Sequence, residues 1–164
     1  MMKRSKWLRE WSVSALILLL AWQAISLWQQ SGLIATAQPA PNFRLPTLSG
    51  DELQLDQITT EQTLLYFFAP WCSICKLSIG NLNQLQDPTV TVIAVALAYD
   101  SPQAVADFVA GQSLNLPVVL GDSRLQQAYG IDMFPTYYVL DRNKRVSSKA
   151  VGYSTALGLK ARIF

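Results

Sequence analysis

The chain has 164 residues, and 51% of them are apolar, which suits one domain with a sizeable hydrophobic core plus an appendage. The formal net charge is only +2, so the composition excludes the strongly basic surface typical of nucleic-acid-binding proteins. The charge is uneven, because four basic residues and one acidic residue give the first ten positions a charge of +3 (Lys3, Arg4, Lys6, Arg9 and Glu10).

An apolar stretch follows this basic start and runs from Trp11 to Trp28. It is about 18 residues long, near the lower limit for crossing a bilayer, and Trp7, Trp11 and Trp28 flank it as interfacial aromatic residues do. Basic residues before the stretch, with none shortly after it, predict a cytoplasmic N-terminus. We therefore expect residues 1–28 to form a transmembrane anchor, as in a single-pass protein of a bacterial inner membrane whose main domain faces the periplasm.

Two alternatives compete with the retained anchor. The stretch resembles a signal peptide, and Ala35-Thr36-Ala37 looks like a cleavage site, although it lies far beyond the apolar region. A buried core helix is disfavoured by the basic start and the flanking tryptophans. The anchor and the signal peptide both place residues after about Ala35 outside the cytoplasm, where redox partners must manage a dithiol pair.

Turn residues and apolar spacing predict the next elements. Residues 29–41 are rich in Gln, Ser, Gly, Ala and Pro and indicate a tether. Residues 42–55 alternate apolar and polar side chains around Ser49-Gly50-Asp51, which is typical of a β-hairpin. An apolar run at 64–68 indicates a buried strand, and helical spacing then predicts a helix from near Cys72 to about Gln86.

The second half of the chain alternates strands and helices and ends in a hairpin and a helix. Ser101 is the expected N-cap of a helix that starts at Pro102, and Gly130 is the expected C-cap of a shorter helix. This order predicts an α/β domain over residues 42–164, with a mixed central sheet flanked by helices. The expected strands are 89–99, 116–120, 136–140 and 145–151, and the expected helices are 102 to 110 or 113, 123–129 and 155–164.

The only two cysteines, Cys72 and Cys75, directly follow the expected buried strand. Thiols at this spacing fit one helical turn and can close and reopen a small disulfide without unfolding the chain. A structural disulfide gains stability by closing a long loop, so this minimal loop favours redox chemistry. Cys72, at the expected helix N-terminus, is the candidate nucleophile, because unpaired N–H groups there favour a thiolate. Cys75 is the candidate resolving thiol, which displaces the partner from a mixed disulfide.

A cysteine pair can also support chemistry other than thiol–disulfide exchange. An internal zinc site is excluded, because it needs four ligands and the chain has no His and no other Cys. A Cu(I)-binding dithiol in copper handling remains an alternative, since thiolates suit that ion. A peroxiredoxin-like peroxidase is a second alternative function. Such enzymes carry a hydroxyl residue about three positions before the reactive cysteine, and Ala69-Pro70-Trp71 ahead of Cys72 has none. The preferred function needs no cofactor.

Two motifs, Phe68-Ala-Pro-Trp-Cys-Ser-Ile-Cys-Lys76 and Met133-Phe-Pro-Thr136, together resemble the thioredoxin superfamily. The expected anchor, the hairpin at 43–55 and the extra strand and helix at 89–110 are similar to its membrane-tethered TlpA/ResA/DsbE branch. The resemblance covers about residues 41–164 and implies a thioredoxin-like fold.

The resemblance also implies roles for individual residues. Cys72 and Cys75 would carry the redox chemistry, and Pro135 would be a cis-proline beside them. The other interpretation of Pro135 is an ordinary proline of a turn or an edge strand. Trp71 and Phe134, the neighbours of Cys72 and Pro135, are the expected substrate contacts.

Two positions depart from the family pattern. Thioredoxin has a buried aspartate six residues before the first cysteine, where this chain has Tyr66. Some reducing relatives have a glutamate three residues after the second cysteine, where this chain has Ser78. The sequence therefore offers no nearby carboxylate as a proton acceptor for Cys75.

Partners follow from the resemblance alone. They would be disulfide-bearing proteins outside the cytoplasm, such as apocytochrome c, and a membrane electron donor that reduces the Cys72–Cys75 disulfide. Because the tethered branch is mostly reducing, we expect a protein disulfide reductase, with a role such as cytochrome c maturation.

Overall fold

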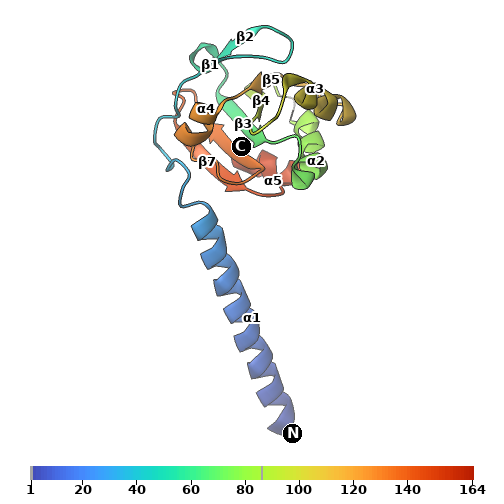
Figure 1. The fold of residues 1–164 in the computed structure, drawn as a ribbon. Coiled ribbons are helices and arrows are strands. Elements are labelled where there is room, and N and C mark those ends of the chain that lie inside the picture. The colour runs from blue at the N-terminus through green and yellow to red at the C-terminus, as the bar shows by residue number, and fades with distance from the viewer. Residues whose placement is uncertain (1, 86) are drawn as a thin grey trace. The chain divides into compact units, whose positions relative to one another are not determined.

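The computed structural model describes residues 2–85 and 87–164, without the side chains of residues 2–9 and 12. The chain divides into two compact units, residues 1–32 and residues 33–164, which are described separately (Figure 1). Two sequence expectations reach residues outside this description, because the anchor begins at Met1 and the helix after Cys72 is expected to end near Gln86.

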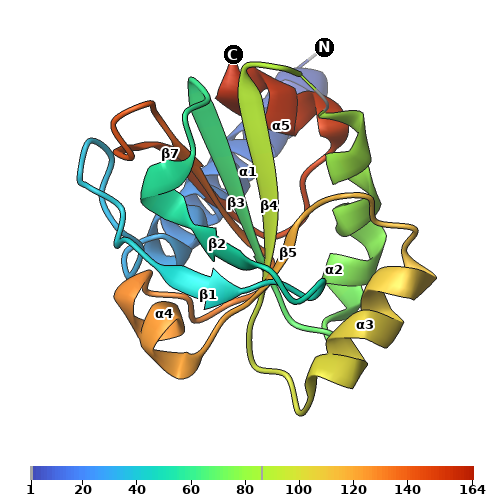
Figure 2. The same ribbon diagram turned by 90° about the horizontal axis from the view of Figure 1, so that it is seen from above.

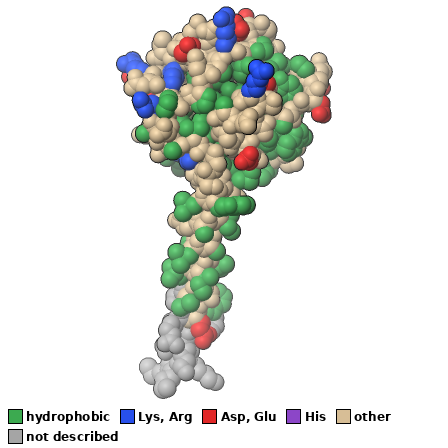
Figure 3. All heavy atoms as spheres, turned by 60° about the vertical axis from the view of Figure 1, so that its left-hand side comes forward, with side chains coloured by type: hydrophobic (Ala, Val, Ile, Leu, Met, Phe, Trp, Pro, Cys, Tyr) green, Lys and Arg blue, Asp and Glu red, His purple; other side chains and the backbone are tan. Residues whose placement is uncertain are grey.

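The first unit contains helix α1 (Met2–Gln29). The side chains of residues 16–20 are 57–70% exposed, and hydrophobic side chains are prominent on the described part of the helix in Figure 3. Among the residues that the structure describes, no helix is both long and apolar enough to cross a membrane. The transmembrane span expected within residues 1–28 is therefore not confirmed, and polar Ser14, Gln23 and Ser26 interrupt its apolar stretch. The exposure of the side chains of residues 16–20 also gives no support to the alternative of a buried core helix.

The second unit is built on a five-stranded sheet with the order β5-β4-β3-β6-β7. Strands β3, β4 and β5 are parallel, while β6 and β7 are antiparallel to their neighbours, so the expected mixed sheet is confirmed (Figure 2). The strand bounds are β3 (Gln62–Phe68), β4 (Val90–Ala96), β5 (Val118–Leu120), β6 (Thr136–Leu140) and β7 (Val146–Val151).

Successive side chains of β3 enter two different cores, because strand side chains alternate between the faces of a sheet. Leu64, Tyr66 and Phe68 lie in one core, and Leu65 and Phe67 lie in the other. Helices α2 (Ser73–Ser78), α3 (Pro102–Gly111) and α5 (Ala156–Ile163) contribute to the first core, together with the 3-10 helix η2 (Ile79–Gln84). Helix α4 (Ser123–Ala128), the 3-10 helix η1 (Leu55–Gln57) and the segment around Phe43 contribute to the second.

Most local predictions agree with the structure. The hairpin consists of β1 (Arg44–Pro46) and β2 (Glu52–Gln54), which pair antiparallel. The hydroxyl of Ser101 caps α3 by accepting the backbone N–H of Ala104 at 3.2 Å. Gly130 has φ 62°, the left-handed conformation expected just beyond a helix end.

The helix after Cys72 is shorter than its apolar spacing predicts. The α-helical part ends at Ser78, and η2 continues it in the tighter 3-10 form. Gly80, Asn81 and Asn83 lie in η2, and glycine and asparagine favour the α-helix less than most residues do. The change in helix type therefore falls where intrinsic α-helix propensity is weakest.

Residues 33–41 differ from the free tether expected at 29–41. The Ala37 N–H donates to the Val146 carbonyl at 2.7 Å, and the Val146 N–H donates to the Gln38 carbonyl at 2.9 Å. Leu33 is buried, and the compact unit begins with it. Because residues 33–41 bind the edge of β7, the domain starts earlier than the sequence predicts, and Ala35-Thr36-Ala37 lies inside it.

Candidate active site

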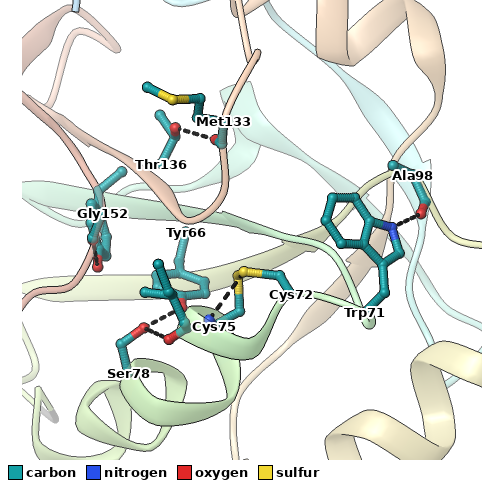
Figure 4. Close-up of a disulfide and its surroundings, with 11 residues drawn as sticks. Tyr66, Trp71, Cys72, Cys75, Ser78, Ala98, Met133, Thr136 and Gly152 are labelled. Carbon is teal, nitrogen blue, oxygen red and sulfur yellow. Dashed lines mark hydrogen bonds between the residues drawn. A yellow bond between two sulfur atoms is a disulfide. The ribbon is translucent and has the colours of Figure 1, made fainter. Parts of the chain in front are cut away.

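Cys72 and Cys75 lie at the point where β3 gives way to α2, and they form a disulfide (Figure 4). Cys72 is the N-cap of α2, with extended backbone angles, and its Sγ accepts the backbone N–H of Cys75 at 3.1 Å. Cys72 is 6% exposed and Cys75 is 0% exposed. The sequence-predicted pair is thus at a helix N-terminus, with Cys72 nearer the surface.

The loop between the strand and the cysteines is fixed by backbone hydrogen bonds. The Phe68 carbonyl accepts the N–H of Leu97, which ties the end of β3 to the residue after β4. The Cys72 N–H donates to the Ala69 carbonyl at 3.0 Å and closes a tight turn around Pro70. This turn brings Cys72 to the carboxyl end of the parallel strands, where ligands and substrates of such sheets commonly bind.

Trp71 has an exposed ring in a fixed orientation. It is 65% exposed, yet its indole N–H donates to the Ala98 carbonyl at 2.8 Å. Its ring also meets the ring of Phe134 edge-to-face, with centroids 5.7 Å apart and planes at 85°. The two residues expected to contact substrate are therefore in contact with one another, although they are far apart in the sequence.

Pro135 follows a cis peptide bond, as the resemblance implies. Its carbonyl accepts the N–H of Gly152 at 2.8 Å, and the next residue, Thr136, donates its hydroxyl to the Met133 carbonyl at 2.7 Å. Thr136 pairs with Phe67 near the end of β3. The sheet register therefore brings the Met133–Pro135 loop to the same end of the sheet as the cysteines.

Tyr66 and Ser78 bond to each other in the core behind Cys75. Their hydroxyl oxygens are 2.8 Å apart, and the Ser78 hydroxyl also donates to the Ile74 carbonyl at 2.9 Å (Figure 4). In the sequence both residues stand out only as positions where relatives carry carboxylates, and their pairing is not predicted. Ser78 lies one helical turn after Cys75, and Tyr66 faces the core on the opposite side of β3 from Leu65. Their contact depends on how α2 packs on the sheet, which local spacing does not show.

The polar groups behind the disulfide are neutral hydroxyls in an apolar setting. Burial raises the pKa of the Tyr66 phenol, although its hydrogen bond to Ser78 opposes the rise. Burial likewise raises the pKa of Tyr137, which meets the Tyr66 ring with centroids 5.1 Å apart. In the described parts of the chain, no group of three or more His, Cys, Asp or Glu residues is placed to hold a metal ion.

An open groove of about 510 Å³ lies beside Trp71. Lys76 of α2 contributes to its lining on the cysteine side, and Asp107 and Phe108 of α3 contribute on the other. Trp71 directly precedes Cys72 in the chain, so this groove lies next to the less buried sulfur of the pair.

Known proteins with similar sequences and structures support this chemistry. The Redoxin family model matches residues 35–159. The thioredoxin-like protein YneN of Bacillus subtilis is 25% identical, over 95% of this chain and 98% of its own length. The thiol-disulfide oxidoreductase ResA of Bacillus thuringiensis is 27% identical, over 71% of this chain and 69% of its own length.

Solved structures agree with the sequence relatives. The crystal structure of a DsbE-type thiol:disulfide interchange protein from Chlorobium tepidum matches with a TM-score of 0.70 and 27% identity. The match covers 79% of this chain and 96% of that one. The fold is thus thioredoxin-like, with the mixed sheet and flanking helices expected from the sequence. The chain belongs to the Redoxin family and is a thiol-disulfide oxidoreductase of the thioredoxin superfamily, similar to TlpA, ResA and DsbE.

Proposed function

We propose that the chain reduces disulfides in partner proteins, with Cys72 as the attacking thiol and Cys75 as the resolving thiol. The observation that carries this assignment is the difference between the two sulfur environments. The Cys75 N–H at 3.1 Å from Cys72 Sγ is placed to stabilise a thiolate at Cys72. Cys75 is completely buried, so Cys72 is the sulfur that a partner reaches first.

The proposed reaction has two exchange steps. The Cys72 thiolate attacks one sulfur of the partner disulfide, and the other partner sulfur leaves as a thiolate. Cys75, as a thiolate, then attacks the Cys72 sulfur of the mixed disulfide and displaces the second partner sulfur. Two electrons pass to the partner, and the chain is left with the Cys72–Cys75 disulfide.

The surface around Cys72 is the proposed contact with the partner polypeptide. Trp71 offers an exposed ring held by the Ala98 carbonyl, and Phe134 supports it from the side. Pro135, in the loop at the same end of the sheet, is proposed to limit access to the sulfurs. The groove beside Trp71 is proposed to bind the part of the partner chain that extends away from its disulfide.

Alkylation and trapping test the roles of the two cysteines. In the reduced protein, iodoacetamide should label Cys72 well below pH 8.5, about the pKa of a free thiol, and label Cys75 much more slowly. Cys75→Ala should accumulate mixed disulfides with partner proteins, and Cys72→Ala should not. Faster labelling of Cys75, or equal trapping by Cys72→Ala, would overturn the assignment.

The direction of the reaction is proposed from the resemblance to a mostly reducing branch. The reduction potential of the Cys72–Cys75 couple tests it directly. A value near that of thioredoxin, about −270 mV, agrees with a reductase, and a value near about −120 mV indicates an oxidant.

We further propose that the domain acts outside the cytoplasm and stays attached to a membrane, where a membrane donor reduces it. The support is the basic start of the sequence and the exposed leucines of α1. The full-length chain should resist alkaline extraction from membranes, with its C-terminal domain open to protease added outside. Soluble protein with an N-terminus near Gln38 would show cleavage instead.

A further inference from the structure

Three hydroxyl side chains surround the buried side of the cysteine helix. Tyr66 comes from β3, Ser78 from α2 and Tyr137 from β6, and all three are 0–1% exposed. They lie in the same core as Cys75, and Figure 4 shows Tyr66 and Ser78 next to it. A thiolate that forms at Cys75 is therefore buried in the core that contains these hydroxyls and is not exposed to water.

Each hydroxyl proton in the cluster already has an acceptor other than sulfur. Ser78 has one hydroxyl proton, and it is donated to the Ile74 carbonyl at 2.9 Å. The proton between Ser78 and Tyr66 must then come from Tyr66, so Tyr66 donates to Ser78. The Tyr137 hydroxyl donates to the Gly152 carbonyl at 2.5 Å. All three hydroxyl protons are therefore directed at oxygen acceptors and not at the Cys75 sulfur.

This hydrogen-bonded chain cannot carry a proton away from Cys75. It runs from Tyr66 to Ser78 and ends at a backbone carbonyl, which is no base at ordinary pH. A thiolate can only accept hydrogen bonds, so a site whose hydroxyl protons are all bound to oxygen acceptors favours the protonated thiol.

The charged side chains on the helices packed around Cys75 are exposed, so they are not buried beside the sulfur to take its proton or stabilise a thiolate. Lys76 of α2 is exposed, as is Arg162 of α5, whose charge acts on Tyr137. Asp107 of α3 is exposed and lines the groove. Among the described residues, the buried polar side chains apart from the tyrosines are all Thr or Ser (Thr47, Thr63, Ser78, Thr136 and Ser154).

We propose that the Tyr66–Ser78 pair keeps Cys75 protonated in the reduced enzyme and so makes resolution by Cys75, rather than attack by Cys72, the slow step at neutral pH. Ser78 acts as the positioning residue, because it holds the Tyr66 proton away from the sulfur. The inference rests on the proposed roles of the two cysteines. In the slow step, Cys75 loses its proton, its thiolate bonds to Cys72 sulfur, and the partner sulfur leaves with the electron pair and takes up a proton.

A two-phase reaction of the full-length protein tests this proposal. One equivalent of the aromatic disulfide 5,5′-dithiobis(2-nitrobenzoate) is added to the reduced chain, and release of its coloured thiolate is followed by stopped flow. The first release reports attack by Cys72, and the second reports resolution by Cys75. In the wild type, the second phase should be the slower one and should accelerate with pH up to at least about pH 8.5, the region of a free thiol.

Ser78→Ala frees the Tyr66 proton to hydrogen-bond the Cys75 thiolate. It should accelerate the second phase about tenfold at neutral pH, the effect of lowering the thiol pKa by about one unit, and leave the first phase unchanged. Tyr66→Phe should not slow the second phase, and adding Ser78→Ala to it should give no further acceleration. Ser78→Thr, which retains the hydroxyl, should behave as the wild type does.

Tyr138→Phe is the matched control, because Tyr138 is a buried tyrosine whose hydroxyl donates to the Tyr129 carbonyl in the other core. It should change stability but neither phase. A slower second phase in Tyr66→Phe would mean that Tyr66 already donates to the thiolate, and this result overturns the proposal even where Ser78→Ala fails to fold. A folded Ser78→Ala protein whose second phase is not accelerated would also overturn it. The same holds if Ser78→Ala still accelerates the second phase when Tyr66 is replaced by Phe. A second release from Cys75→Ala would instead refute the cysteine roles themselves.

Discussion

Trp71 illustrates how a single exposed residue can be fixed in place without being buried. Its indole N–H is bonded to the Ala98 carbonyl, and its ring rests against Phe134, so little side-chain freedom remains to be lost on binding. Preorganised aromatic rings of this kind are typical anchors of protein interfaces. The residue is 65% exposed, so most of its ring surface is available for the proposed contact with a partner protein.

We predict that Trp71→Ala raises the KM for a protein disulfide such as insulin at least severalfold, with a smaller change in kcat. The KM of Trp71→Phe should lie between those of the wild type and Trp71→Ala. Phenylalanine can keep a ring contact with Phe134 but loses the hydrogen bond to the Ala98 carbonyl. The measurement is steady-state insulin reduction, with urea unfolding to follow stability. Leu157→Ala, at an exposed apolar residue of α5, is the control and should leave KM unchanged. An equal rise in KM for Trp71→Ala and Leu157→Ala would contradict a specific role for Trp71.

At the scale of elements, residues 33–41 behave as part of the domain's edge. They hydrogen-bond to β7 and to the turn before it, through Ala37, Gln38 and Ala40. An uncovered sheet edge exposes unpaired backbone groups, and this segment pairs those of Val146 at the start of β7. Its Gln, Ala and Pro content indicates a tether because composition reports local preference, whereas the edge it binds is formed by residues more than 100 positions later.

Truncation separates a structural segment from a passive tether. A domain that begins at Leu33 should be more stable than one that begins at Asn42 by about 2 kcal/mol, since the shorter chain loses the burial of Leu33 and several backbone hydrogen bonds. Urea unfolding of the two soluble domains provides the comparison. A chain that begins at Ser31 serves as the reference and should match the Leu33 chain. Identical unfolding midpoints for all three would show that the segment contributes nothing.

For the whole molecule, sequence patterns predicted what depends on local spacing and missed what depends on long-range contacts. The run at 64–68 and the Cys72–Cys75 pair were enough to place a buried strand ahead of a redox turn, because both signals lie within a dozen residues. The expectation for Pro135 came from the resemblance, and the pairing of β6 with β3 is what brings its loop to the cysteine end of the sheet. The Tyr66–Ser78 bond could not be predicted from local patterns, because it needs the packing of α2 on the sheet to be known.

Buried tyrosines should make the whole domain sensitive to alkali. Tyr66, Tyr129, Tyr137 and Tyr138 are 0–1% exposed, and burial raises the pKa of each phenol, that of Tyr138 to about 12. A raised pKa favours the neutral form in the folded state, so this contribution to stability is fully present below about pH 10, where unfolded tyrosine stays neutral. It is lost as the pH rises from about 10 toward the folded pKa values, because the unfolded chain releases protons that the folded chain retains.

We predict that the free energy of unfolding falls above pH 10 by up to about 1.4 kcal/mol per pH unit for each buried tyrosine. Tyrosinate absorbance and far-ultraviolet circular dichroism should be recorded together while the pH is raised. Most of the tyrosinate signal should appear in the same narrow range in which the secondary structure is lost, since these phenols ionise when the cores open. If all the tyrosines of the chain titrated near pH 10 while the circular dichroism stayed native, the hydroxyl cluster behind Cys75 would have to be open to water. The pH dependence of the resolving step would then need a different cause.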